Sequence, residues 1–385
     1  MTAAARQAAH PGGTEVPAGA LAITGFGVVG GAGIGPEPLA GVLAGHRQAP
    51  AEPGELFEDD LPGPEGHALT GFSVREHLGR KGTSFLDRGT GLGLLACTLA
   101  LADAGLDVHD GNRARIGITL GTTHGSMKST SDYSRATHTE HRPYHVNPVL
   151  FPNAVMNSVA GQAAIRTGLH GPNSTVAGGT TAMAQVLRYG RNLIGCGYAD
   201  TLLAGTVEEF SPQHAWAVRA IQAAEGGDLP PGEGAAVFVV RSAAAVRAAG
   251  DEPLAEILAA EVGSFDPPGE DPARYTAGFA ACLHRALHRA RVRPDQVGTV
   301  CTGGNGMPAL DGAESRALDE VVGSTAPRIA VADAVGESGA AFGGLQLACV
   351  LAAHRAGAQS ELFLLSSRSS DGSVGVLLVR TGMRS

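Results

Sequence analysis

The sequence predicts an α/β protein made of stacked layers of helices and sheets. Short apolar runs that fit strands alternate along the 385 residues with longer stretches whose apolar residues recur at helical spacing. Alternation of this kind favours layered sheets in which most strands run parallel. The order of the elements also repeats once along the chain. Sequence similarity between the repeats is faint, so the internal duplication is inferred from their order.

The first half is expected to span 21–250, after a disordered tail over 1–20 that lacks the apolar run of a secretory signal. Apolar runs predict strands at 21–24 with 28–29, 115–120, 174–176, 200–205 and 235–240. Helical spacing predicts helices at 36–44, 90–104, 155–167 and 180–195. The polar segments 48–70 and 122–148 are expected to be irregular excursions.

The second half, 251–385, is expected to repeat this order. Strands are predicted at 254–265, 297–302, 328–332, 362–366 and 374–379, and helices at 279–291, 311–322 and 344–356. The helix and strand over 92–120 have a counterpart at 279–302. The Gly-rich turn, helix and strand over 177–205 have one at 336–366.

Composition excludes several classes of partner. The formal net charge of −9 argues against a nucleic acid or an anionic membrane, and no strongly apolar, charge-free run of 18 residues is long enough to span a bilayer. The odd number of cysteines and their spacing favour reduced thiols in a cytoplasmic protein over disulfides or a metal site. They are Cys97, Cys196, Cys282, Cys301 and Cys349. Four histidines at 124, 138, 141 and 145 also lack a metal-ligand spacing, and no metal or cofactor is expected.

Two short motifs resemble known sites without the context that those sites need. Gly25–Gly30 fits G-x-G-x-x-G after a strand, but the next residues, GAGIGPEP, cannot open a helix on a phosphate, so a glycine-lined strand exit is favoured. The segment Gly336–Ala340 is close to a nucleophile elbow. It lacks the final glycine, and the one downstream histidine, His354, is predicted to lie within a helix.

A set of segments in fixed order resembles the β-ketoacyl-carrier-protein synthase, or condensing enzyme, family. The segments are ITGFGVV at 23–29, FPNAVMNSVAG at 151–161, GLHGPN at 168–173, AD at 199–200 with AG at 204–205, and GEGA at 232–235. The resemblance covers about residues 20–381. It implies a thiolase-like fold, in which two similar βαβαβαββ halves form a layered αβαβα arrangement.

The resemblance also implies that the family's catalytic groups are missing. Thr180 stands where the family has its nucleophilic cysteine, Gly303 where it has the first histidine and Glu337 where it has the second. The family's gating phenylalanine corresponds to Ser370. A threonine hydroxyl is a poor nucleophile without an adjacent base, so no catalytic residue is expected.

Such a chain is similar to the chain-length factor of type II polyketide synthases. The resemblance implies a non-catalytic subunit that forms a heterodimer with an active ketosynthase, shapes its acyl tunnel and works with an acyl carrier protein. A diverged enzyme is the alternative, with altered acyl-transfer or decarboxylase chemistry at Thr180 and Glu337. A module that binds carrier-protein cargo is a third interpretation.

The resemblance places two segments at the subunit interface. The segment after the second strand would reach the partner's tunnel, with candidate residues Met127, Thr130, Tyr133, Ser134 and Thr137. Packing at the interface without lining the tunnel is the other interpretation of these residues. The strand Ser174, Thr175 and Val176 would pair across the two-fold axis. The segment 206–232 is short and lacks a family-like loop on the substrate side.

Overall fold

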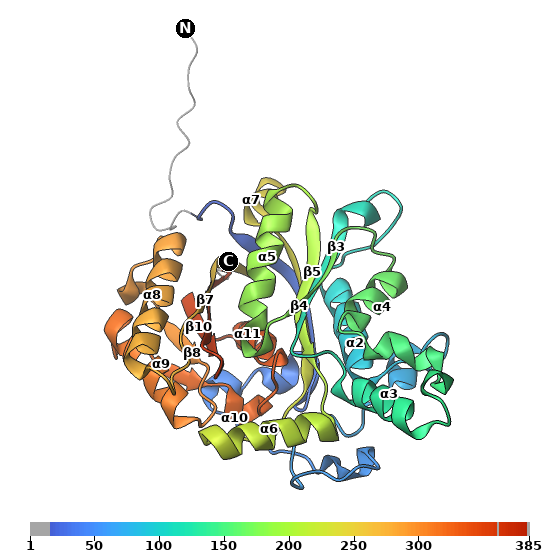
Figure 1. The fold of residues 1–385 in the computed structure, drawn as a ribbon. Helices are drawn as coiled ribbons and strands as arrows, with labels where there is room; N and C mark the ends of the chain where they lie inside the picture. The colour runs from blue at the N-terminus through green and yellow to red at the C-terminus, as the bar shows by residue number, and fades with distance from the viewer. Residues whose placement is uncertain (1–15, 360–361, 383–385) are drawn as a thin grey trace.

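Eleven strands form one continuous mixed sheet in the computed structural model, which describes residues 16–359 and 362–382 (Figure 1). Residues 1–15 of the tail predicted over 1–20 lie outside the described residues. No helix in the part of the chain that the model describes is long and apolar enough to cross a membrane.

The sheet repeats one strand order twice. The first half contributes the order β4-β3-β5-β6-β1 and the second half the order β9-β8-β10-β11-β7, and the two meet where β1 pairs with β7. The strands of the first half are β1 (Leu21–Gly30), β2 (Gly33–Ile34), β3 (Ile116–Thr122), β4 (Asn173–Ala177), β5 (Thr201–Glu208) and β6 (Gly234–Ser242). Those of the second half are β7 (Ala255–Ser264), β8 (Thr299–Thr302), β9 (Arg328–Ala330), β10 (Leu362–Arg368) and β11 (Ser373–Thr381).

The prediction of largely parallel sheets is wrong. Strand β3 is parallel to β4 and β5, and β8 is parallel to β9 and β10, but every other neighbouring pair within the described sheet is antiparallel. The antiparallel strands are nearly as buried and apolar as the parallel ones. Because helices cover both faces of the sheet, hydrophobic patterning does not distinguish the two directions.

Helices pack in three layers around the sheet (Figure 1). In the first half they are α1 (Val74–Leu78), α2 (Arg88–Asp103), α3 (Met127–Thr139), α4 (Ser158–Thr167), α5 (Ala182–Gly195), α6 (Pro212–Glu225) and α7 (Ala243–Ala248). In the second half they are α8 (Pro272–Ala290), α9 (Pro308–Val321), α10 (Ala332–Val335) and α11 (Ala341–Arg355). Short 3-10 turns lie at 37–39, 42–44, 53–56, 113–115, 143–145, 148–154, 179–181 and 294–296.

The core confirms the five-layer arrangement. Apolar side chains of α5 and α11 pack between the two halves of the sheet, in one cluster with strands of both halves. Helices α2 and α4 cover the outer face of the first half, and α8 and α9 cover that of the second. Helix α11 is buried on nearly all sides, as an apolar helix in a central layer must be.

The glycines of the G-x-G-x-x-G segment serve packing. Gly25 and Gly27 lie in the middle of β1. A Cβ on Gly27 would collide with the backbone of α2 at Ala96, and one on Gly25 with the backbone of Ala104, the residue that ends α2. The missing side chains therefore let α2 lie directly against β1. The segment is the interior of a strand that continues to Gly30.

Five helices lie where none was predicted, the short α1, α7 and α10 and the longer α3 and α6. Helix α3 occupies the first part of the expected excursion at 122–148, and its N-terminus is capped by the Ser126 hydroxyl, which accepts from the Ser129 amide. Helix α6 fills most of 206–232 and begins with the cap Ser211 followed by Pro212. The helix predicted at 36–44 is instead two separate 3-10 turns.

Candidate functional site

A cavity of about 160 Å³ opens at one end of the central layer. The turn after β3, the start of α5, helix α6, the start of α9, the turn before α11 and the end of β10 surround it. One part of its wall is apolar, with Met127, Ala217, Val218, Ile221, Met307 and Leu310. The other part is polar, with Thr123, His124, Thr180, His214, Asn305, Glu337, Arg368, Ser369 and Ser370.

Thr180 lies in the short turn that leads into α5, at the edge of this cavity. Its hydroxyl donates a hydrogen bond to the backbone carbonyl of Arg368, at 2.5 Å. In the described part of the chain no carboxylate or imidazole accepts a hydrogen bond from this hydroxyl. The hydroxyl proton is therefore held by a carbonyl that cannot act as a general base.

Gly303 does not line the cavity, and the space beside it is filled. A Cβ at this position would lie 3.2 Å from the Ser366 carbonyl oxygen and 3.4 Å from Cγ of Arg368. Its amide donates to Oε1 of Glu314 at 2.8 Å. The Arg368 side chain therefore occupies the direction in which a side chain at 303 would extend.

Arg368 is a site residue that sequence analysis missed. Its fully buried guanidinium donates from Nε to Oε2 of Glu314 at 2.9 Å and from Nη1 to Oδ1 of Asn305 at 3.2 Å, and it pairs with Asp311 through Nη2. Two carboxylates and an amide thus surround one buried cation. The available signal was a lone arginine at the end of the apolar run LFLLSSR, together with acids at 311 and 314 on one helix face.

Glu337 also lines the cavity, in the turn that precedes α11. Its Oε2 accepts a hydrogen bond from Nδ2 of Asn305 at 3.0 Å, and its backbone pairs with Pro230 and Gly232. Burial raises the pKa of its carboxyl above the ordinary value. Thr180 and Glu337 face the same cavity, but each is hydrogen-bonded to another group.

His214 is a second residue that sequence analysis missed. It lies on α6, where burial lowers the pKa of its imidazole, and its Nε2 lies 3.4 Å from the backbone oxygen of Glu337. The N-cap signal of α6, Ser211 followed by Pro212, could have placed this histidine on a helix. Burial therefore favours the neutral forms of both His214 and the Glu337 carboxyl.

Glu208 lies behind the cavity, at the end of β5. Its Oε2 accepts from the backbone amides of Thr123, at 3.0 Å, and Ala340, at 3.1 Å, and also from the Thr123 hydroxyl. Burial is the main cause that raises its pKa to about 7, and the nearby Glu337 raises it further. This carboxyl thus joins the ends of β3 and β5 to the start of α11.

The predicted tunnel and interface residues fall into two groups. Met127 lines the cavity, whereas Thr130, Tyr133, Ser134 and Thr137 lie further along α3, partly or largely exposed. The Tyr133 ring contacts Phe151 with the ring centroids 5.7 Å apart. Ser174, Thr175 and Val176 lie in β4, a strand at the edge of the described sheet that pairs with β3 alone.

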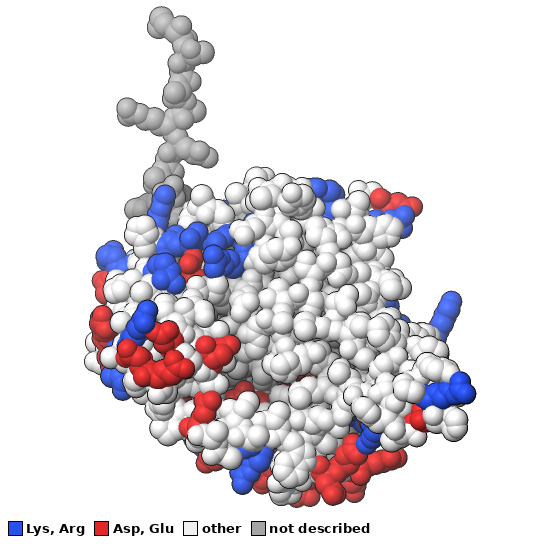
Figure 2. Space-filling view, in the orientation of Figure 1, with Lys and Arg blue, Asp and Glu red and all other residues white. Residues whose placement is uncertain are grey.

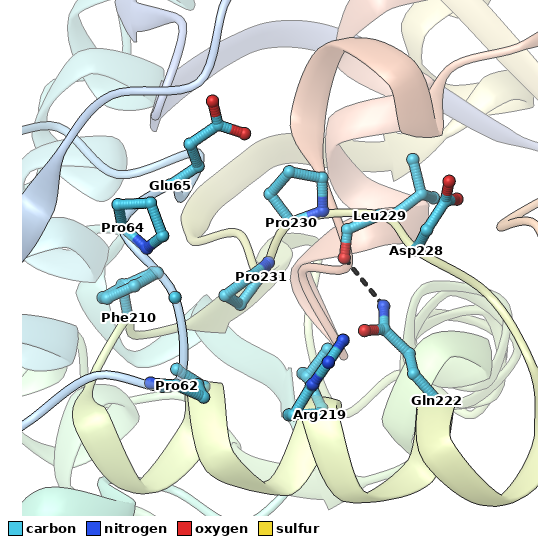
Figure 3. Close-up of a pocket in the computed structure, with 13 residues that line it drawn as sticks. Pro62, Pro64, Glu65, Phe210, Arg219, Gln222, Asp228, Leu229, Pro230 and Pro231 are labelled. Atoms are coloured by element: carbon cyan, nitrogen blue, oxygen red, sulfur yellow. Dashed lines mark hydrogen bonds between the residues drawn. The ribbon is translucent and has the colours of Figure 1, made fainter.

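A second cavity of about 170 Å³ lies on the other side of α6 (Figure 3). Prolines 62, 64, 230 and 231 and the Phe210 ring form much of its wall, and Gln222 of α6 donates to the Leu229 carbonyl at its rim. Val218 lines both cavities, so α6 is the partition between them. Among the described residues no group of three or more His, Cys, Asp or Glu side chains could hold a metal ion.

Comparisons with known proteins match this architecture. The family model described as Beta-ketoacyl synthase, N-terminal domain, matches residues 19–228, and the model for the C-terminal domain of the same family matches residues 254–360. The solved structure of the ishigamide ketosynthase/chain length factor is 35% identical, with a TM-score of 0.80, and the similarity covers 94% of this chain and 99% of that chain.

Two curated relatives are more distant. The tetracenomycin polyketide synthase ketoacyl synthase alpha subunit of Streptomyces glaucescens is 29% identical over 307 residues, which is 72% of each chain. A 3-oxoacyl-[acyl-carrier-protein] synthase 2 of Vibrio cholerae serotype O1 is 26% identical over 272 residues, which is 66% of each chain. The matched region thus spans just under two thirds of the Vibrio protein.

Proposed function

The chain belongs to the β-ketoacyl synthase family, with its thiolase-like fold, and we propose that it is a non-catalytic subunit of the chain-length-factor kind. In this proposal it forms a heterodimer with an active ketosynthase of a type II polyketide synthase, in the cytoplasm. The subunit shapes the tunnel in which the partner's acyl chain grows, and an acyl carrier protein delivers that chain. The site around Arg368 is the observation that carries the proposal.

The chemistry of condensation needs a thiolate and two histidines, and none of the three positions supplies one. The Thr180 hydroxyl is hydrogen-bonded to a carbonyl, Gly303 has no side chain, and Glu337 is a half-buried carboxyl with a raised pKa. Arg368 fills the space beside Gly303 and is fixed there by Glu314 and Asp311. Restoring one catalytic residue would therefore disturb a buried ionic network.

The similarity to the ishigamide ketosynthase/chain length factor supports the pairing. It extends over nearly the whole of both chains, so the fold likeness is not limited to one half. The free edge of β4 supports the same proposal, because an edge strand offers unpaired backbone groups to a strand of another chain. Large apolar side chains are also exposed in the first half, at Val149, Leu150, Phe151, Met156 and Ile165.

Helix α3 is proposed to reach the partner's tunnel. It begins at the cavity with Met127 and ends among exposed residues, with Tyr133 packed on the exposed Phe151. We propose that these side chains limit the length of the partner's product. A Tyr133→Ala variant is expected to allow a longer product, whereas unchanged product length would contradict the tunnel role.

The deciding experiment is co-expression of this chain with a ketosynthase from the same gene neighbourhood. Native mass spectrometry of the purified complex should show one copy of each chain, and condensation should require both. The Thr180→Ala variant, combined with the intact ketosynthase, should give unchanged product yield. A chain that forms no complex with the ketosynthase, or that condenses substrates alone, would overturn the proposal.

A diverged enzyme is the second candidate, because Thr180 and Glu337 do line one cavity. In this case the Thr180 hydroxyl would attack a thioester carbonyl and form an ester as the C–S bond breaks. Glu337 would take the hydroxyl proton and pass it to the departing thiolate. Intact-mass measurement after incubation with an acyl thioester distinguishes the two candidates. An acyl adduct that disappears in Thr180→Ala would favour the enzyme, and its absence from the unmodified chain would reject it.

A further inference from the structure

Four arginines gather on the surface between α5 and α8, far along α5 from Thr180. Arg188 and Arg191 lie one turn apart on α5, and Arg285 and Arg289 lie one turn apart on α8. Figure 2 shows them as a blue area at the upper left, with a small red area among them. We call these four residues the arginine patch.

One carboxylate is shared by the patch. Glu261 of β7 lies 2.5 Å from Nε of Arg289 and 3.9 Å from Nε of Arg285, and its side chain is only 6% exposed. Within the described residues Arg188 and Arg191 donate no hydrogen bond and form no ion pair. The patch therefore keeps an excess of positive charge, on a chain whose net charge is −9.

The four guanidinium groups are close enough to act on one another. Partial burial, and after it Arg289 and Arg188, lower the pKa of Arg191, although Glu261 acts in the opposite direction. Burial raises the pKa of the Cys282 thiol on α8 to about 11, and Arg285 and Arg188 both act to lower it. Like charges held this close repel one another, and an anionic partner would remove that repulsion.

Glu261 is the one carboxylate of the described residues that pairs with the patch, and it does not balance four arginines. An acidic group from another molecule would balance the remaining positive charge.

The spacing of the patch indicates the kind of partner. Each helix presents two guanidinium groups one turn apart, so each row of the patch has a helical repeat. A helix with carboxylates at i and i+3 or i+4 has the same repeat. Arginine also binds carboxylates through two parallel hydrogen bonds.

We propose that the arginine patch docks an acidic helical surface of a partner protein. The inference does not depend on the proposed function, because none of the four arginines lines the cavity and the two on α5 lie two to three turns beyond Thr180. A docked helix would lie across α5 and α8, with its carboxylates over the four arginines.

The test uses the full-length chain and a fluorescein-labelled helical peptide of about 20 residues with glutamates at i, i+4 spacing. Fluorescence anisotropy at low ionic strength should show binding that salt weakens, because exposed charges are screened within about 10 Å at 0.1 M. The double variant Arg188→Gln/Arg191→Gln should bind about tenfold more weakly. Arg75→Gln, an exposed arginine on α1, is the matched control and should bind within a factor of about two of the unmodified chain.

The other outcomes count against the proposal. Equal binding of a peptide with glutamines in place of glutamates would reject recognition of carboxylates. Tighter binding of inorganic phosphate or of a DNA oligonucleotide than of the acidic peptide would assign the patch to another ligand. Loss of binding together with a lower unfolding midpoint in the double variant would point to a structural role. The proposal expects an unchanged or higher midpoint, because the variant removes repulsion.

Discussion

Gly303 and Arg368 share one space beside the cavity, so a side chain at 303 must displace the arginine. We predict that Gly303→His lowers the free energy of unfolding by about 1–3 kcal/mol, the usual cost of overpacking a filled core. Urea denaturation followed by circular dichroism measures this change. Gly304→Ala is the matched control, because a Cβ there meets its nearest atoms only at 3.5 Å, and its stability should change little. Equal stability of the histidine variant and the unmodified chain would show that Arg368 moves aside.

The buried charge of Arg368 gives a second prediction. Replacing it in Arg368→Met leaves Glu314, whose side chain is 3% exposed, without its cation, and the expected loss of stability is about 3–5 kcal/mol. Adding Glu314→Gln should recover part of the loss, because the unpaired carboxylate is gone. The control Arg293→Met breaks an exposed ion pair with Asp295 and should leave the urea midpoint unchanged. A lack of recovery in the double variant would mean that the arginine acts through packing alone.

Glu208 should make stability depend on pH. Its pKa is about 7 in the folded chain and 4.5 for the free side chain, so the folded state binds the proton more tightly. Its contribution is therefore complete below about pH 4.5 and is lost as the pH rises through about 7. Glu208→Gln stays neutral at every pH and should reduce this fall in unfolding free energy by about 1–3 kcal/mol.

Denaturant titrations at pH 5, 6 and 7 measure the slope of the unfolding free energy against pH. Glu225→Gln, an exposed residue on α6, is the control and should leave the slope as it is. Part of the slope should remain in Glu208→Gln, since the buried Glu209 has a pKa raised to about 8. An unchanged slope in Glu208→Gln would show that its carboxyl is already ionised at pH 5.

At the scale of single residues, the sequence predicted the positions of site residues better than it predicted their hydrogen-bond partners. Thr180 and Glu337 were placed by segments of the family pattern, and both line the cavity. Their hydrogen bonds, to Arg368 and to Asn305, join residues far apart in the chain. Pairings of that kind follow from the packing of β10 beside α5 and α9, which no local pattern in the sequence records.

Elements were predictable where a buried face marked them. Helices α2, α5, α8 and α11 have apolar residues at helical spacing in the sequence. The predicted ends of these helices lie within about two helical turns of the observed ends. Helix α3 has no fully buried residue, so it lacks the apolar stripe on which a helix prediction depends. Its serine cap and polar contacts hold it in place instead.

At the scale of elements, we predict that a charged side chain on the edge strand β4 prevents its pairing with another chain. Ser174→Lys places a long charged side chain on a strand whose outer edge is free, and charge on an edge opposes pairing with another strand. We expect the variant to fold but to lose most of the proposed complex with a ketosynthase, as judged by co-purification and size-exclusion chromatography. Ala330→Lys in β9, the strand at the opposite edge, is the matched control and should keep the complex. Loss of the complex in both variants, or in neither, would contradict a role specific to β4.

At the scale of the whole molecule, the repeated order of elements predicted the layers. Each half has the same strand order and the same set of parallel and antiparallel neighbours. The prediction of the strand direction was wrong, because strands that are buried on both faces have the same apolar pattern whether they run parallel or antiparallel. Where one half ends and the next begins, near residue 250, stays a prediction, because the sheet runs on without interruption through β1 and β7.

The shared core predicts that the two halves unfold together. Leu21 of β1 pairs with Ser242 of β6 and with Ile257 of β7, and the side chains of α5 and α11 pack against strands of both halves. Separating the halves would expose this central layer, so a half should not be stable alone. The single tryptophan, Trp216 on α6, reports on the first half by fluorescence, whereas far-ultraviolet circular dichroism reports on all helices and strands. We expect both probes to give one urea transition with the same midpoint. A tryptophan transition that precedes or follows the circular dichroism transition would show that the halves are independent domains.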